Sequence, residues 1–151
     1  MFDRLAKLLA TFFYVGDIPV APGSAASAVG VLIYLCLYAD TAAYIVLTVI
    51  IALIGFAVCG RTERFLKKKD PSVIVIDEVA GVLVAFFLLP VSWPVILVAY
   101  FLFRAFDMFK LYPVNKFDEK EGSVGIMMDD LVAGLYTNIT MHIAIRLAGI
   151  V

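Results

Sequence analysis

The sequence has few of the charged residues that a soluble domain needs. Charged residues make up 17% of its 151 residues, against about a quarter in soluble globular domains. Hydrophobic residues make up 64%, and the mean hydropathy is +1.02. A chain this apolar needs lipid as the solvent for much of its surface. Its formal net charge of -1 gives no indication of nucleic acid binding.

Cysteine and histidine are also scarce, and this excludes several kinds of site. Cys36 and Cys59 lie in apolar stretches with no second Cys or His at metal-ligand spacing, so we expect both to be buried. A Cys-x5-Arg nucleophile is excluded because Phe65 occupies the position where Arg is needed. His142, the single histidine, lies in the last apolar segment and is interpreted as structural. The Asp-x-Asp, Lys-x6-Arg-Pro and Asp-Gly-x-x-Ala-Arg patterns of other phosphatases and lipid synthases are absent.

Apolar segments of helical length divide the chain into about five spanning helices. Each span needs roughly 20 residues, so the chain has the length for one domain of four to six spans. We place Ser24 as the N-cap of the first span and Asp70 or Ser72 as the N-cap of the third. The predicted fold is all-α, a polytopic membrane helical bundle in a single domain over residues 1–151, without internal repeats. An interfacial helix over residues 1–13 precedes spans over residues 25–39, 42–59, 70–89, 95–110 and 125–148.

Basic residues gather at one end of these predicted spans. With alternating spans, only Arg146 lies at the opposite face from the other cations. Cytoplasmic loops carry an excess of Lys and Arg, so the face with the cations is predicted to be cytoplasmic. Residues 61–69 are expected to form a basic loop that attracts anionic lipid. An alternative is that this loop only sets the topology.

Five carboxylates fall near the same face. At about 1.5 Å per helical residue, Asp77 lies roughly 7 Å inside its span, Asp107 roughly 6 Å and Asp129 roughly 9 Å. Glu78 and Asp130 are their sequence neighbours. Carboxylates within a membrane are costly and by default mark a functional site. Such a cluster would take up protons unless cations joined it, and oxygen ligands suit Mg²⁺ best.

Groups that suit an anion are predicted beside these carboxylates. Arg104, Asp107 and Lys110 recur on one helical stripe, which offers cations for phosphate or, alternatively, an internal ladder of ion pairs. Ser24 and Gly125 lie near helix N-termini, where free N–H groups and the helix dipole favour an anion. The excluded motifs leave metal-bound water as the expected nucleophile, with a carboxylate as general base.

Four segments of the chain match the motifs of one known family, in that family's order. Residues 16–24 read G-D-I-P-V-A-P-G-S, residues 70–81 D-P-S-V-I-V-I-D-E-V-A-G, residues 103–113 F-R-A-F-D-M-F-K-L-Y-P and residues 125–134 G-I-M-M-D-D-L-V-A-G. With these segments the chain resembles the phosphatidylglycerophosphatase A family. One departure is that the family's Thr-Trp-Gly-Ser after Pro-Gly is replaced here by S-A-A-S at residues 24–27. The aromatic side chain is lost, although both hydroxyl positions remain.

The resemblance implies Mg²⁺-dependent hydrolysis of phosphatidylglycerophosphate to phosphatidylglycerol and phosphate. It implies an enzyme of the bacterial inner membrane, and the topology places the site at the cytoplasmic face. The oligomeric state stays open. The catalytic groups are expected among Asp77, Glu78, Asp107, Asp129 and Asp130, the metal ligands among Asp77, Glu78, Asp129 and Asp130, and the phosphate-binding groups are Arg104, Lys110, Ser24 and Gly125.

Two other functions would use the same residues. A small ion or proton transporter component would relay protons or bind an ion on these carboxylates, although transport sites usually lie nearer the bilayer midplane. A membrane assembly factor without catalytic activity would pair the carboxylates internally with Arg104 and Lys110.

Overall fold

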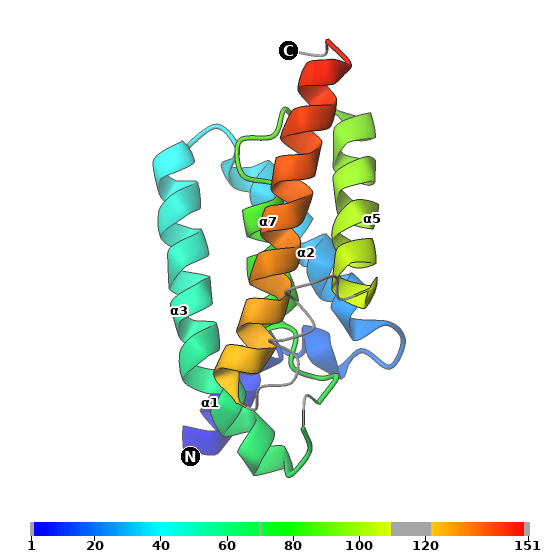
Figure 1. Cartoon of the computed structure of the whole chain (residues 1–151). Helices are drawn as coiled ribbons and strands as arrows, with labels where there is room; N and C mark the ends of the chain where they lie inside the picture. The colour runs from blue at the N-terminus through cyan, green and yellow to red at the C-terminus, as the bar shows by residue number, and fades with distance from the viewer. Residues whose placement is uncertain (1, 70, 110–121, 150–151) are drawn as a thin grey trace.

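The computed structural model describes residues 2–69, 71–109 and 122–149. Within these ranges the chain forms six α-helices and one short 3-10 helix, and no strand (Figure 1). The all-α fold class predicted from the sequence is confirmed. The elements are α1 (Phe2–Ala10), η1 (Val15–Asp17), α2 (Pro22–Leu37), α3 (Thr41–Leu66), α4 (Ile76–Ala85), α5 (Trp93–Phe109) and α7 (Ser123–Leu147).

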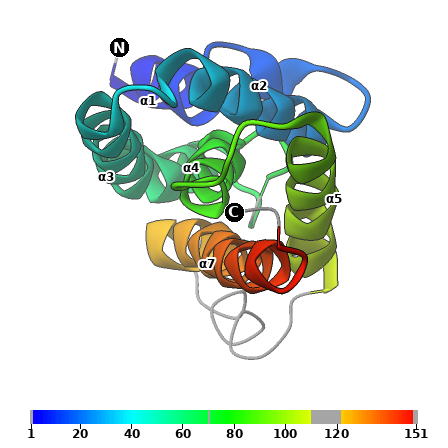
Figure 2. The ribbon, with the colours of Figure 1, turned by 90° about the horizontal axis from the view of Figure 1, so that it is seen from above.

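Helix α4 lies at the centre of the bundle, with the other helices around it (Figure 2). It packs against α2, α3, α5 and α7. All of its residues except Glu78 and Val84 are buried. With 10 residues, α4 is only about 15 Å long, half the thickness of a bilayer's hydrocarbon core. It is therefore a half-length helix enclosed by longer ones.

Side chains of the surrounding helices satisfy the backbone where α4 ends. The last carbonyl groups of a helix have no partner within the helix, and inside an apolar bundle they need other donors. Tyrosines from α2 and α3 and polar side chains from α7 supply them. The contacts are Tyr44 Oη to Leu83 O (2.6 Å), Asn138 Nδ2 to Ala85 O (3.1 Å) and Phe87 O (2.8 Å), His142 Nε2 to Phe87 O (3.2 Å), and Tyr34 Oη to Leu89 O (2.8 Å).

The predicted third span was wrong at both ends. A helix over residues 70–89 was expected, whereas α4 begins at Ile76 and ends at Ala85. Before α4, the chain is held against the end of α1, because the Val75 N–H donates to the Ala10 carbonyl at 2.9 Å. Asp77 consequently lies in the first turn of its helix, and not a full turn inside it.

Three further local predictions need correction. Helix α2 begins at Pro22, so Ser24 lies inside the helix and is not its N-cap. Proline suits the first helical position because its fixed φ is helical and its missing N–H is not needed there. Helix α3 continues to Leu66, so the first part of the predicted basic loop is helical. Cys36 is exposed, and only Cys59 is buried as expected.

The prediction of five spanning helices is not confirmed. Among the described residues, only α3 is both long enough and apolar enough to cross a membrane, with a mean hydropathy of 2.7 over its best window. Helix α2 is apolar but has only 16 residues. The criterion concerns length and composition alone, so the structure supports a membrane location only weakly.

Candidate active site

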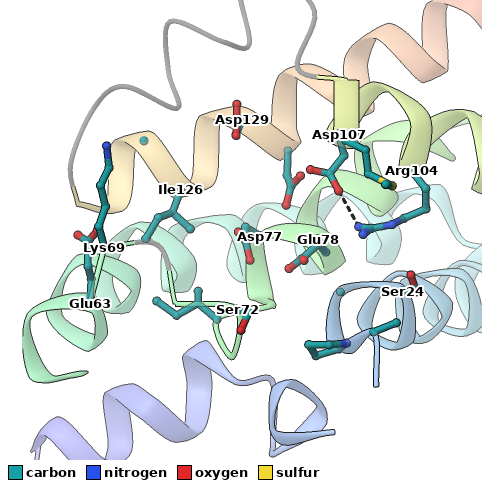
Figure 3. A pocket seen from close by; sticks show the side chains of 17 residues that line it. Ser24, Glu63, Lys69, Ser72, Asp77, Glu78, Arg104, Asp107, Ile126 and Asp129 are labelled. Carbon is teal, nitrogen blue, oxygen red and sulfur yellow. Dashed lines mark ion pairs between the residues drawn. The ribbon is translucent and has the colours of Figure 1, made fainter. Parts of the chain in front are cut away.

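A cavity of about 390 Å³ lies where the ends of several helices meet. The first residues of α2, α4 and α7 line it together with the last turns of α3 and α5. Among the described residues, six acidic and two basic side chains lie on its wall, and Figure 3 draws the side chains that line it. The acidic residues are Glu63, Asp77, Glu78, Asp107, Asp129 and Asp130, and the basic residues are Lys69 and Arg104.

Three of these carboxylates form a compact group. One oxygen each of Asp77, Glu78 and Asp130 lies within 4.8 Å of the others. Asp77 is 7% exposed and Asp130 2% exposed. Asp77 Oδ1, Glu78 Oε2 and Asp130 Oδ1 are buried and accept no hydrogen bond from any described residue. Carboxylates whose buried oxygens lie this close repel one another strongly unless a positive charge is shared among them.

A short repeat that the sequence analysis missed brings α4 and α7 together. Residues 77–81 read D-E-V-A-G and residues 130–134 read D-L-V-A-G. A Cβ added to Gly134 would collide with the carbonyl of Gly81, and one added to Gly81 would lie 2.7 Å from the carbonyl of Asp130. The two glycines therefore mark a contact of backbone against backbone. Asp77 and Asp130 each lie four residues before their glycine, so the two parallel helices present both carboxylates at the same level.

Arg104 and Asp107, which both belong to α5, form an ion pair beside this carboxylate group. Arg104 Nη1 lies 2.7 Å from Asp107 Oδ2, and both side chains are less than one-fifth exposed. The backbone of α2 packs closely here, because a Cβ at Gly23 would meet both Glu78 and Arg104. The guanidinium is thus held beside the carboxylates. Its pairing with Asp107 is one step of the ladder of ion pairs that the sequence analysis gave as an alternative.

The other predicted site residues are placed as follows. Asp129 lines the cavity and is 8% exposed, but it is not one of the three clustered carboxylates. Its role as a metal ligand therefore stays a prediction. Ser24 and Gly125 also line the cavity, and the Ser24 carbonyl accepts a hydrogen bond from Tyr100 Oη at 3.0 Å. Lys110 lies outside the described residues.

Sequence reasoning missed several lining residues at the end of α3 and just beyond it. Glu63 accepts a hydrogen bond from the Gly122 N–H at 2.8 Å, and Ser123 Oγ accepts one from the Gly60 N–H at 2.7 Å. These contacts fix the start of α7 against α3. Lys69 and Ser72 also line the cavity. Glu63 was the one acid within a run of cations, and reading that run as a continued helix would have drawn attention to it.

The donor set of the cavity suits a hard divalent cation. All three clustered ligand candidates are carboxylates, and each offers a buried oxygen that accepts no hydrogen bond from the described residues. Mg²⁺ and similar ions prefer such oxygen ligands. The cluster therefore fits a metal ion, although it does not identify which one.

Comparisons with known proteins point to one family. The model of the family "Phosphatidylglycerophosphatase A" matches residues 8–145. A phosphatidylglycerophosphatase A of Haemophilus influenzae is 36% identical over 138 residues, covering 89% of this chain and 85% of the relative. One of Escherichia coli is 32% identical over 131 residues, covering 85% and 76%.

A third relative has a different name. A putative phosphatidylinositol-3-phosphatase of Bacteroides thetaiotaomicron is 34% identical over 149 residues, covering 93% of each chain. No solved structure matches the chain significantly.

Proposed function

The chain belongs to the phosphatidylglycerophosphatase A family, and on this basis we propose that it hydrolyses phosphatidylglycerophosphate to phosphatidylglycerol and inorganic phosphate. The observation that carries the proposal is the group of carboxylates Asp77, Glu78 and Asp130, each with a buried oxygen, beside the cation of Arg104. Such a site can bind a metal ion and a phosphate together. The matches to phosphatases favour this function over an ion transporter.

A divalent cation, which we propose to be Mg²⁺, would be held by Asp77, Glu78 and Asp130. When bound, it would neutralise these carboxylates, polarise the phosphate and make a water molecule a better nucleophile. The support for this assignment is that each of these residues has a buried oxygen accepting no hydrogen bond from the described residues.

The remaining residues of the site then have distinct tasks. Arg104, oriented by Asp107, binds oxygens of the terminal phosphate as a charge-assisted donor. Asp129, next to Asp130 but outside the clustered three, takes the proton of the attacking water. As the water oxygen bonds to phosphorus, the bond from phosphorus to the glycerol oxygen breaks, and that oxygen takes up the proton that Asp129 received from the water. Ser24, Gly125 and Lys110 complete the proposed phosphate-binding set.

We also propose that the whole chain is one domain in the bacterial inner membrane, with its site at the cytoplasmic face. Large apolar side chains are exposed along several helices, as expected for a surface covered by lipid. Examples from α2, α3, α5 and α7 are Leu32 at 60%, Leu53 at 63%, Phe101 at 66% and Ile143 at 55% exposed. Helices α2, α5 and α7 would then cross together with α3, as a packed group around the half-length α4.

The test is phosphate release from phosphatidylglycerophosphate by the purified protein in non-ionic detergent micelles. We expect turnover to stop with EDTA, to return with Mg²⁺, and to fall at least a hundredfold in Asp77→Asn and Asp129→Asn. Asp40→Asn is the matched control. Asp40 caps α3 away from the cavity, and asparagine caps a helix equally well. We therefore expect this variant to keep wild-type activity.

A second measurement separates metal binding from catalysis. Mg²⁺ should raise the thermal midpoint of the wild type, because a ligand that binds only the folded state stabilises it. The rise should be lost in Asp77→Asn and kept in Asp40→Asn. Undiminished turnover in both Asp77→Asn and Asp129→Asn would show that the site is assigned wrongly. Preferred turnover of phosphatidylinositol 3-phosphate would replace the proposed substrate with the one named for the Bacteroides relative.

A further inference from the structure

The two cations that line the cavity in the described part of the chain lie at opposite ends of its row of carboxylates. Figure 3 shows Arg104 at one end beside Asp107 and Lys69 at the other end beside Glu63. Arg104 belongs to α5, whereas Lys69 follows the end of α3. Arg104 is engaged by Asp107, while Lys69 makes no ion pair with any described residue. The cavity therefore has a second cationic end that the proposed hydrolysis does not use.

Among the described residues, six acidic side chains line this cavity and only two basic ones do, so an anionic ligand meets few attractive charges there. One divalent cation held by three carboxylates would compensate only part of that negative charge. A ligand with two phosphate groups therefore needs a separate positive group for each of them. Arg104 lies beside the carboxylates where hydrolysis is proposed, and Lys69 is the other cation among the described lining residues.

The lipids named for the family and for the Bacteroides relative share a chemical feature. Phosphatidylglycerophosphate and phosphatidylinositol 3-phosphate both carry a phosphodiester, next to the diacylglycerol, and a terminal phosphomonoester. Only the phosphomonoester is hydrolysed. The phosphodiester remains in the product, so any group that binds it contributes to recognition without taking part in the bond that breaks.

We propose that Lys69 binds the phosphodiester of the lipid headgroup and thereby gives the site its preference for lipids that carry both a phosphodiester and a phosphomonoester. The inference rests on the proposed function, which places the phosphomonoester at the Arg104 end. Lys69 is then a residue that determines specificity and does not touch the reacting phosphorus.

Lys68 provides a matched control for Lys69. The two residues are adjacent, carry the same charge and are both exposed, but Lys68 does not line the cavity. If the basic segment only attracted anionic lipid to the surface, or only set the topology, loss of either lysine would have the same effect. A difference between the two variants therefore reports contact within the cavity.

The first experiment compares two substrates in non-ionic detergent micelles at saturating Mg²⁺. Phosphatidylglycerophosphate carries both groups, while phosphatidic acid carries a phosphomonoester without the phosphodiester. We expect Lys69→Ala to lower the ratio of kcat/KM for the first over the second about tenfold, mainly through KM, and Lys69→Arg to restore most of it. Lys68→Ala should keep the ratio within about twofold of wild type.

The second experiment needs no turnover. Phosphatidylglycerol retains the phosphodiester, and its retention by the purified protein can be counted by native mass spectrometry. We expect Lys69→Ala to retain severalfold less phosphatidylglycerol than the wild type and Lys68→Ala. Thermal midpoints of the two variants, measured alongside, should agree, which excludes a difference in folding.

These outcomes separate the two proposals. An unchanged substrate ratio in Lys69→Ala, or equal losses in Lys69→Ala and Lys68→Ala, would overturn the role of Lys69. A wild type that releases no phosphate from phosphatidylglycerophosphate would refute the proposed function. In that case the retention of phosphatidylglycerol would still decide whether Lys69 binds a phosphodiester.

Discussion

The contact between α4 and α7 at Gly81 allows a test of how the carboxylates are positioned. In Gly81→Ala the new Cβ would lie 2.7 Å from the Asp130 carbonyl oxygen, whereas ordinary contact begins at 3.4 Å. It would also lie 2.8 Å from the ring of Phe103, which is fully buried. The two helices must therefore separate by about 0.7 Å.

That separation acts directly on the proposed ligands, because the Asp130 carbonyl is itself part of the contact and Asp77 lies one helical turn before Gly81. Metal–ligand distances tolerate deviations of only about 0.2 Å, and misplacing reacting groups by 1 Å can lower a rate roughly a hundredfold. We expect Gly81→Ala to lower kcat/KM between about tenfold and a hundredfold and to raise the Mg²⁺ concentration for half-maximal activity about tenfold. Overpacking should also lower the free energy of unfolding by about 1–3 kcal/mol.

The control is Gly30→Ala, which overpacks the opposite side of α4. Its Cβ would lie 2.9 Å from a side-chain carbon of Val82 and not against the backbone of α7. Thermal unfolding and Mg²⁺ titration of both variants separate loss of stability from loss of positioning. If Gly81→Ala lost stability like Gly30→Ala but kept the Mg²⁺ dependence of the wild type, the contact would not position the carboxylates.

Two further predictions concern stability. Asn138→Leu leaves the carbonyls of Ala85 and Phe87 without this donor, so we expect the free energy of unfolding to fall by about 1–3 kcal/mol. The thermal midpoint should be lower, and the Mg²⁺ dependence of activity should be unchanged. An unchanged midpoint would argue against this role of Asn138. A hydrogen bond from Arg61 lowers the pKa of Asp3. This link between α1 and α3 should therefore stabilise the protein at pH values above the ordinary carboxyl pKa. The stabilisation should be lost as the pH falls through the lowered pKa of Asp3. The small difference in thermal midpoint between wild type and Asp3→Asn should therefore vanish at low pH, and a difference that grew on acidification would contradict the assignment.

The sequence predicted helices well where apolar residues run without interruption. Helices α2, α5 and α7 begin within a few residues of the expected positions. Composition also led to the error at the end of α3, because the run of Arg and Lys was read as a loop. Arg and Glu are good helix formers, and α3 continues until Lys67 adopts a left-handed φ of 51°.

The candidate site was predictable as a set of residues but not as an arrangement. The carboxylates could be identified because an acid in an apolar helix is costly. Which of them cluster depends on the backbone contact of Gly81 with Gly134, and the glycines reveal this contact only when the two D-x-V-A-G segments are compared. Lys69 could not be assigned to the cavity, because charge alone does not distinguish it from Lys67 and Lys68.

The short length of α4 is itself part of the electrostatics of the site. A continuous helix from residue 70 would have placed Asp77 and Glu78 beyond the first turn, where the effect of the helix dipole has faded. Starting at Ile76, α4 directs its free N–H groups and positive dipole end towards these carboxylates. The position of that start depends on the end of α1, and the early stop depends on Tyr34, Tyr44 and Asn138. A helix whose two ends are fixed by distant residues cannot be delimited from its own sequence.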